Sequence, residues 1–365
     1  MGSPKEHLPL DISEDTIRAL IAFLDLPAPQ SVSTLSTTAE YHSIYVISFA
    51  PEEVAAVFPT LPQSNKQCVE LILRVSGHHL PRIKTINEVA VMTWVRQNTH
   101  LPVAEVIRYD ASTNNPLGHE FTLLQRVPGV PVSEIYDRLP PQLLEGLINQ
   151  MVEIIHQLHA ISWDCVSGLQ FDDDGRVVPG PIVEETFWQQ PDVAKYWPDT
   201  ESVQSLNICG PYKYYTDYIA AMVRVYQHAI RLHPSLADMR DLLPRLDAFV
   251  KVLSDFPELN NTRYFLAHKD LHFANILAFL WNGQYSEGAM EEKDRVSTLF
   301  AERCAALGLI SLIEETKPSS AVQAAMQEAI NYLRAIVEVR PRGQKEERIP
   351  SWRATLEAQL KILGI

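Results

Sequence analysis

The most constraining feature of this 365-residue chain is a short polar loop that directly follows an apolar stretch, Tyr264 to Ala267. The loop contains His268, Asp270 and Asn275 in the order His-Lys-Asp-Leu-His-Phe-Ala-Asn. This order is typical of a catalytic loop, in which the Asp carboxylate takes a proton and the Asn five residues later binds a metal ion. The alternative is an ordinary turn with a hydrogen-bonded Asp. Because the matched positions directly follow an apolar strand, we favour the catalytic loop.

A loop of this kind needs a second metal-binding Asp, which should end a new apolar strand shortly downstream. Here no Asp occurs between Asn275 and Asp294. A hairpin with its exit loop needs roughly 15 to 25 residues, and the chain directly after Leu277 has no room for one. We therefore interpret the Ala278–Phe279 junction as the place where such a stretch has been lost, by an alternative splice, a mistaken gene model or a true deletion.

The hydrophobic pattern changes once along the chain, near residues 126–132. Before this point a helix is expected over 85–98, and β-branched and aromatic residues predict strands. The expected strands are 41–58, 69–75, 103–109 and 120–127. After this point apolar residues recur at helical spacing, most clearly over 143–158, and a tight turn is expected at 171–176. Further expected helices are 212–232, 239–253 and a tail after 290 that Pro318, Pro341 and Pro350 interrupt.

These patterns predict three parts. The first is an N-terminal helical extension, residues 1–30, with a helix over 13–26 that Ser13 caps. The second is a β-rich lobe, residues 31–127, and the third is a mostly helical lobe, residues 128–365.

Composition excludes several partners. The formal net charge of −14 and the pI near 5.3 argue against nucleic acid or an acidic membrane surface, since both require clustered cations. No apolar run reaches membrane-spanning length, and the first residues lack the apolar core of a signal peptide. The four cysteines lie far apart and form no CxxC motif, so the sequence suggests no zinc ribbon and no disulfide framework. We expect a cytoplasmic protein, and the sequence is silent on its oligomeric state.

The β-rich lobe, the hinge and the helical lobe that carries His268-x-Asp270-x-x-x-x-Asn275 together resemble an aminoglycoside-phosphotransferase-like kinase, in particular the fungal branch of that family. The resemblance spans roughly residues 30 to 300 and is most specific in the loop. It implies an α+β, two-lobed protein-kinase-like fold. It also implies ATP and Mg²⁺ as cofactors and a small hydroxylated molecule as the acceptor.

The resemblance assigns roles to the loop residues. Asp270 would be the catalytic base that accepts the acceptor's proton, and Asn275 would be a magnesium ligand. His268 would brace the loop through hydrogen bonds, and His272 would support it in the same way.

In the β-rich lobe, the resemblance implies that Arg74 is the cation that holds the nucleotide phosphates and that Glu88 is its ion-pair partner. The alternative is a surface strand Arg beside a solvated helix Glu. The segment expected to cover the phosphates, Ser31 to Tyr45, contains no glycine. Gln125 and Val127 would meet the adenine through their backbone groups.

An aromatic group in the second lobe has two interpretations. It either lines an acceptor pocket or packs in the core. Its members are Trp188, Trp197, Tyr212, Tyr214, Tyr215 and Tyr218.

Three functions remain open from the sequence. The preferred one is an ATP-dependent small-molecule kinase that is impaired by the missing Asp, because neutralising charge is most of the catalysis in this reaction. The first alternative is a pseudokinase or another nucleotide-binding or small-molecule-binding protein. The second alternative is a metallohydrolase that uses His268, Asp270 and His272, although three ligands without a distant fourth make a poor site.

Overall fold

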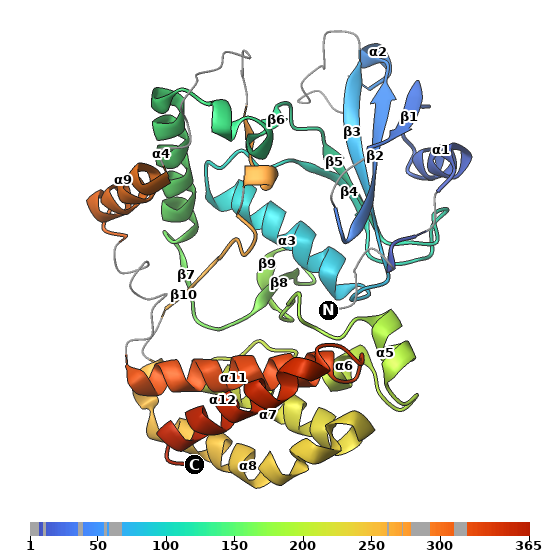
Figure 1. The fold of residues 1–365 in the computed structure, drawn as a ribbon. Coiled ribbons are helices and arrows are strands. Elements are labelled where there is room, and N and C mark those ends of the chain that lie inside the picture. The colour runs from blue at the N-terminus through green and yellow to red at the C-terminus, as the bar shows by residue number, and fades with distance from the viewer. Residues whose placement is uncertain are drawn as a thin grey trace.

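The structure is a computed structural model that describes residues 7–9, 12–35, 39–54, 57, 68–260, 263–271, 273–278, 293–309 and 320–365. These residues form a β-rich lobe and a larger, mostly helical lobe (Figure 1). The α+β, two-lobed fold class predicted from the sequence is confirmed.

The β-rich lobe is built on one antiparallel sheet of five strands in the order β1-β2-β3-β5-β4. The strands are β1 (Ser31–Thr34), β2 (His42–Phe49), β3 (Val69–Ser76), β4 (Val106–Asp110) and β5 (Phe121–Gln125). Alternate residues of β3 are buried, as expected of a strand with one face on a core. The residues between them, including Arg74, face the opposite side.

Helix α1 (Glu14–Phe23) covers the core face of this sheet. Its side chains Ile17, Leu20 and Ile21 are fully buried in the same hydrophobic cluster as the β3 residues. The Ser13 hydroxyl accepts a hydrogen bond from the Thr16 N–H at 3.2 Å, which confirms the predicted N-cap.

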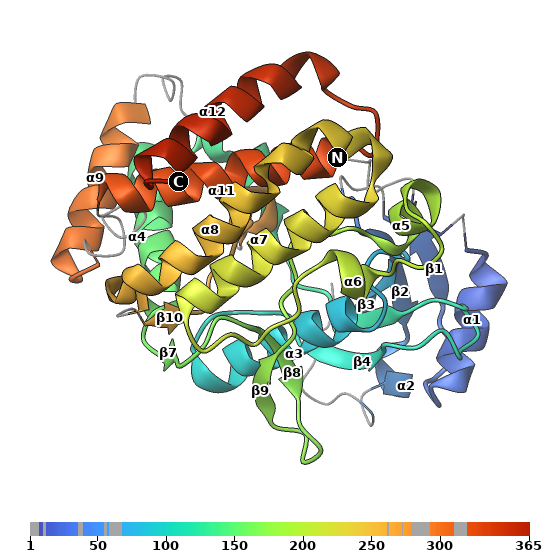
Figure 2. The ribbon, with the colours of Figure 1, turned by 90° about the horizontal axis from the view of Figure 1, so that it is seen from below.

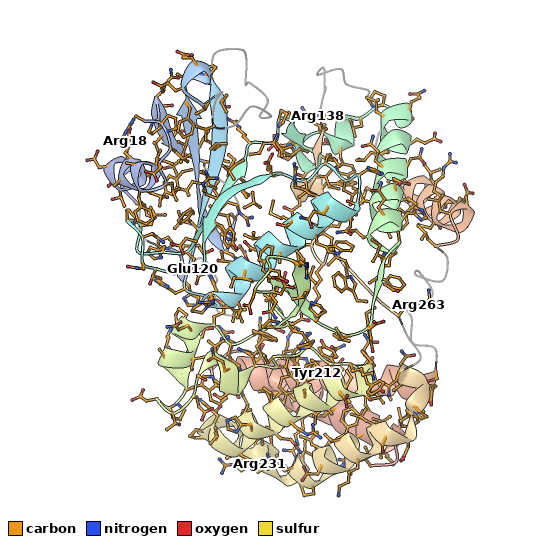
Figure 3. The ribbon with its side chains drawn as sticks, turned by 180° about the vertical axis from the view of Figure 1, so that it is seen from behind. Arg18, Glu120, Arg138, Tyr212, Arg231 and Arg263 are labelled. Atoms are coloured by element: carbon orange, nitrogen blue, oxygen red, sulfur yellow. The ribbon has the colours of Figure 1, made fainter. Side chains whose placement is uncertain are left out.

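Helix α3 (Ile83–Asn98) lies between the sheet and the second lobe (Figure 1). At its N-terminal end, where Figure 3 labels Glu120, the Arg82 N–H donates to the Glu120 carboxylate at 2.6 Å. Its other face packs Trp94 with Leu158 and Leu169. Leu169 belongs to the hairpin of β8 (Gly168–Phe171) and β9 (Val177–Gly180), so the turn predicted at 171–176 is confirmed.

The helical lobe consists mainly of helices. Nearest the viewer in Figure 2, which is seen from below, lie α7 (Tyr215–Leu232), α8 (Leu243–Val252), α11 (Ala321–Val339) and α12 (Ile349–Ile362). Among the residues that the structure describes, this lobe also contains the helices α4 (Pro141–Leu158), α5 (Gln190–Tyr196), α6 (Val203–Leu206) and α9 (Lys293–Ala306). Within the described ranges, no helix combines the length and the apolar character that crossing a membrane requires.

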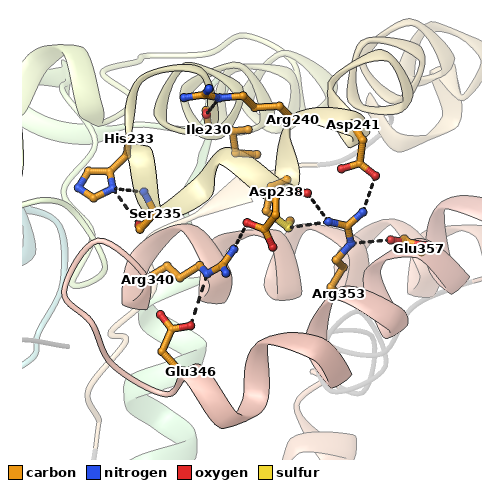
Figure 4. A network of polar contacts seen from close by, with 11 residues as sticks. Ile230, His233, Ser235, Asp238, Arg240, Asp241, Arg340, Glu346, Arg353 and Glu357 are labelled. Atoms are coloured by element: carbon orange, nitrogen blue, oxygen red, sulfur yellow. Dashed lines mark hydrogen bonds and ion pairs between the residues drawn. The ribbon is translucent and has the colours of Figure 1, made fainter.

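A network of ion pairs ties the 3-10 segment η4 (Pro234–Leu242) to α11 and α12 (Figure 4). Arg353 on α12 contacts Glu357 at 2.8 Å and Asp241 at 2.5 Å. Arg340, directly after α11, pairs with Asp238. These contacts fix α11, one face of which borders the pocket described below.

Two strand and helix predictions need correction. The strand predicted over 41–58 ends at Phe49, and helix α2 (Pro51–Val54) follows it. Pro51 has no N–H for a sheet ladder, and the acidic Glu52 and Glu53 favour the first turn of a helix. The helix predicted over 239–253 is a 3-10 segment up to Leu242 and an α-helix only after it.

The segments expected to be loops or breaks also differ. Part of the predicted covering loop, Ser31 to Thr34, is strand β1 and pairs with β2. Pro350 does not interrupt the tail, because it lies in the first turn of α12, where a missing N–H has no cost.

Candidate active site

Two short strands anchor the catalytic loop, residues 268–275. Before it, β10 (Tyr264–Phe265) pairs with β7 (Ser162–Trp163). After it, β11 (Leu277–Ala278) pairs with β6 (Val130–Pro131), directly beyond the hinge. The Val132 N–H also donates to the Ile276 carbonyl at 2.8 Å. The loop is therefore held against the chain segment that joins the two lobes.

The structure brings together the three loop residues that the sequence predicts. Asn275 Nδ2 donates to Asp270 Oδ2 at 2.7 Å and to the Asp270 carbonyl at 2.9 Å. The Asp270 N–H donates to His268 Nδ1 at 3.3 Å, so His268 contacts the loop backbone as a bracing residue would. All three side chains are exposed.

The oxygen atoms of this loop suit Mg²⁺. Because Nδ2 of Asn275 donates to Asp270, the carbonyl oxygen Oδ1 is the Asn275 atom that can ligate a metal. Mg²⁺ prefers oxygen ligands and usually takes one or two carboxylates together with phosphate oxygens and water. His272 and the Phe279 side of the predicted junction lie outside the described residues. Among those described, no group of three His, Cys, Asp or Glu side chains could hold a metal.

The residues predicted to bind phosphates lie in a mostly buried group, here called the amino-lobe cluster: His42, Arg74, Lys84 and Glu88. Arg74 Nη2 lies 3.9 Å from Glu88 Oε2, which places the two predicted partners together. The closest cation to Glu88 is Lys84, whose Nζ lies 2.7 Å from Oε1. His42 Nε2 lies 3.3 Å from Glu88 Oε2.

Electrostatics within the amino-lobe cluster are strong. Burial raises the pKa of the Glu88 carboxyl, but Lys84, His42 and Arg74 outweigh burial and hold that pKa well below its ordinary value. Burial lowers the pKa of His42 to about 4, with Arg74 and Lys84 acting in the same direction. At neutral pH the cluster thus contains a carboxylate and a neutral imidazole.

The hinge residues lie at the end of β5. The Gln125 N–H donates to the Glu105 carbonyl at 2.8 Å, and the Gln125 side chain accepts from the Glu105 N–H at 3.3 Å. The Val127 N–H has no acceptor among the residues that the structure describes. Val127 therefore offers a backbone donor where the resemblance expects an adenine contact, whereas the N–H of Gln125 is already used.

Tyr41 connects the two groups. Its ring lies 5.7 Å from Lys84 Nζ. Burial raises the pKa of the Tyr41 phenol, and the carboxylates of Glu185, Glu40 and Asp270 add to the rise. Tyr41 is thus in contact with the amino-lobe cluster and within the electrostatic field of the catalytic loop.

A narrow pocket lies in the helical lobe and is linked to the loop by Lys269. Lys269 Nζ lies 2.5 Å from Glu184 Oε2, and Glu184 lines the pocket. The pocket has about 60 Å³ of room for the centres of water molecules. Its polar and aromatic lining includes Glu184, Trp188, Tyr218, Tyr226, Arg334 and Glu338. Burial raises the pKa of the Glu338 carboxyl, while Arg342 and Arg334 oppose the rise.

The residues of the predicted aromatic group therefore lie in different environments. Trp188 and Tyr218 line this pocket. Trp197 is buried and packs edge-on against Trp188 with ring centroids 5.1 Å apart, whereas Tyr214 is exposed.

Sequence reasoning missed several residues of the site. Lys84 could have been found, because it stands four residues before Glu88 on the same helix and such pairs face each other. His42 comes from another strand, and Glu184 lies 85 residues from Lys269, so neither has a local signal.

Comparison with known protein families gives a match over most of the chain. The model of the family described as "APH: Phosphotransferase enzyme family" matches residues 61–286. The matched segment contains the catalytic loop, both hinge residues, and Arg74, Lys84 and Glu88 of the amino-lobe cluster.

Similar proteins were found by sequence and by structure. Two subtelomeric hrmA-associated cluster proteins, from two strains of Aspergillus fumigatus, are each 27% identical over 114 residues. That match covers 28% of this chain and 22% of either relative. The GDP complex of wild-type aminoglycoside 2'-phosphotransferase-IIIa has a TM-score of 0.43 at 12% identity, over 95% of this chain and 97% of that one. The complex of gentamicin with APH(2'')-IIa has a TM-score of 0.39 at 11% identity, over 96% and 99% of the two chains.

Proposed function

We propose, from the premise that this chain belongs to the phosphotransferase enzyme (APH) family, that it is an ATP-dependent small-molecule kinase. In this proposal the γ-phosphoryl group of ATP is transferred to a hydroxyl group of a small acceptor. The amino-lobe cluster binds the phosphates, and the catalytic loop carries the chemistry. The proposal includes the boundaries 31–127 and 128–365 for the two lobes, a cytoplasmic location, and no nucleic-acid or membrane partner.

One observation carries the proposal: the hydrogen bond of 2.7 Å from Asn275 Nδ2 to Asp270 Oδ2. It fixes the carboxylate and the amide relative to each other, so that one can act on the acceptor while the other faces the metal.

The residues have separate tasks in this mechanism. The Asp270 carboxylate orients the acceptor hydroxyl and takes its proton as the new O–P bond forms. Arg74 binds phosphate oxygens with its forked guanidinium. Mg²⁺, when bound through Asn275, would neutralise part of the charge on the transferred group. His268 holds the loop backbone in place.

The pocket beside Lys269 supports a choice of acceptor. Its lining combines two carboxylates, Glu184 and Glu338, and one guanidinium, Arg334, with the hydroxyl-bearing rings Tyr218 and Tyr226. Carboxylates among aromatic rings favour a cationic group, and the tyrosine hydroxyls can hydrogen-bond a hydroxylated one. We propose a small molecule that carries both hydroxyl and amine groups.

The missing Asp supports a second candidate, a nucleotide-binding pseudokinase. No Asp follows Asn275 until Asp294, so one of the two metal carboxylates of this reaction is absent from its expected place. The kinase proposal accordingly includes impaired turnover.

The test uses the full chain with ATP and MgCl₂. ATP should raise the melting temperature, and a panel of hydroxylated amines should reveal slow phosphoryl transfer. Asp270→Asn should lower that transfer about 10²- to 10⁴-fold while ATP affinity stays nearly constant, since the carboxylate acts on the acceptor.

The outcomes separate the candidates. ATP binding without any transfer would favour the pseudokinase. Equal transfer by the wild type and Asp270→Asn would remove Asp270 from the mechanism, and no ATP-dependent stabilisation would refute nucleotide binding altogether.

A further inference from the structure

Two side chains that the sequence did not assign to the phosphate site, His42 and Lys84, contact its predicted members: His42 contacts Arg74, and Lys84 contacts Glu88. His42 is on β2 and Arg74 on β3, while Lys84 and Glu88 are one turn apart on α3. The contacts between them determine where the charge of Arg74 can act.

Lys84 is the main ion-pair partner of Glu88. Its Nζ lies 2.7 Å from Glu88 Oε1, whereas the closest approach of Arg74 to Glu88 is 3.9 Å. A separation of 2.7 Å permits a charge-assisted hydrogen bond, and 3.9 Å does not. The carboxylate is therefore used by Lys84, and Arg74 is only loosely attracted to it.

His42 fixes the guanidinium instead. Arg74 Nη2 lies 3.0 Å from His42 Nδ1. Because a guanidinium has only donors, Nδ1 must be the accepting nitrogen. In the neutral ring the proton then resides on Nε2, which lies 3.0 Å from Lys84 Nζ and 3.3 Å from Glu88 Oε2. The ring thus accepts a hydrogen bond from the guanidinium on one side and lies beside the Lys84–Glu88 ion pair on the other.

The remaining donors of Arg74 are available. Nε and Nη1 have no acceptor among the residues that the structure describes, and the side chain is 27% exposed. A guanidinium held at one nitrogen and open at the others suits phosphate oxygens, which accept two parallel hydrogen bonds.

We propose that Lys84 and His42 are positioning residues of the nucleotide site. Lys84 forms the ion pair with Glu88, so that this carboxylate does not hold Arg74, and His42 orients Arg74 toward the phosphates. The inference rests on the proposed function, because it concerns the same site. It differs from the expected pairing, in which Glu88 would hold Arg74 directly.

The first test compares two variants of His42 by calorimetric titration with ATP and MgCl₂. His42→Gln keeps an acceptor for Arg74 and should bind ATP within about threefold of the wild type. His42→Leu keeps the bulk but offers Arg74 no acceptor, and should weaken ATP binding about tenfold or more.

The second test separates positioning from direct contact at Lys84. In Lys84→Met the unpaired Glu88 should draw Arg74 away from the phosphates and weaken ATP about tenfold. The double variant Lys84→Met/Glu88→Gln should recover most of that loss, since the competing carboxylate is gone. If Lys84 contacted ATP directly, the double variant would not recover.

The outcomes are distinguishable. A wild type that does not bind ATP would overturn the proposed function and this inference together. A wild type that binds ATP, with equal affinities in His42→Leu and His42→Gln or no recovery in the double variant, would overturn this inference alone. If His42→Leu does not fold, the ¹⁵N chemical shifts of His42 in the wild type decide instead: protonated Nε2 supports the inference, and protonated Nδ1 refutes it.

Discussion

The amino-lobe cluster and the catalytic loop each take part in a close pair of a carboxylate and a cation, but the surroundings of the two pairs differ. Glu88 is 25% exposed, and its partners Lys84 and His42 are 11% and 5% exposed. In the loop, Lys269 is 59% exposed and its partner Glu184 is 22% exposed, so the two pairs differ in the exposure of the cation and not of the carboxylate. The cluster rests on strands of eight residues and a helix of sixteen, whereas strands of two residues flank the loop.

Because of this difference, substitutions in the two regions should differ in how much they affect folding and how much they affect the reaction. A buried charge that loses its partner has no water to replace it, so changes in the cluster should affect folding as well as binding. An exposed charge is solvated with or without its partner, so changes in the loop should affect the reaction and leave stability nearly constant.

Glu88→Gln should have the largest effect on stability. It leaves Lys84 and Arg74 close together without the carboxylate that both approach, and removing one partner of a buried pair costs about 3 to 5 kcal/mol. The measurement is the free energy of unfolding of the wild type and of Glu88→Gln, each determined by urea denaturation. A loss under about 1 kcal/mol, the size expected of an exposed pair, would contradict the contrast between the two regions.

The stability should also depend on pH through His42. Its pKa is about 4 in the folded protein and 6.5 ordinarily, so the unfolded chain takes up the proton first as pH falls. The contribution of the neutral His42 ring to the free energy of unfolding is complete above about pH 6.5 and is lost as the pH falls from that value to pH 4. At about 1.4 kcal/mol per pH unit, the loss amounts to roughly 3 kcal/mol.

His42→Gln is the control for that pH dependence, because the amide does not titrate. The variant should show a shallower fall in unfolding free energy over the same pH range, while the carboxylates that titrate elsewhere act equally on both proteins. Parallel curves for the two proteins would show that His42 is not the group responsible.

Gly129 tests how firmly the loop is anchored to the hinge. Its φ is +137°, and an added Cβ would lie 2.8 Å from the Ala278 carbonyl oxygen on β11. Gly129→Ala should cost about 1 to 3 kcal/mol through strain and this clash and should lower transfer by shifting the loop. Gly118→Ala is a matched control, since Gly118 also has a positive φ of +65° but no atom within 4 Å of the added Cβ. Equal losses in both variants would mean that the close approach to β11 has no consequence.

The fold could be predicted where one element carries its own signal. The cap and apolar stripe of α1, the alternation in β3 and the helical spacing of α4 all act within one segment. The sequence prediction ends β2 too late, because Val54, Val57 and Phe58 suggest that the strand continues past Phe49, whereas Pro51 starts a helix. Its boundary depends on a missing hydrogen-bond donor rather than on hydrophobicity.

The same distinction holds for the candidate site. The loop residues His268, Asp270 and Asn275 are neighbours in sequence, and the structure places them in contact. The amino-lobe cluster depends on register: Ile44 on β2 faces Arg74 on β3, which brings His42 within reach of the guanidinium. Such a contact is set by strand pairing, so the sequence alone indicated Arg74 and Glu88 but not the ring between them.

Lys269→Met should have the smallest effect on stability, and this makes it the most direct test of the loop. The pair with Glu184 joins an exposed ammonium to a carboxylate on another segment, and exposed pairs contribute about 0 to 1 kcal/mol. Unfolding in urea should therefore change little. Because Glu184 lines the proposed acceptor pocket, removing its partner should instead change the KM for a cationic acceptor, with the KM for ATP unaltered. If Lys269→Met lowered the free energy of unfolding by more than about 2 kcal/mol, the Lys269–Glu184 pair would behave like a buried pair. The contrast between the two regions would then be wrong.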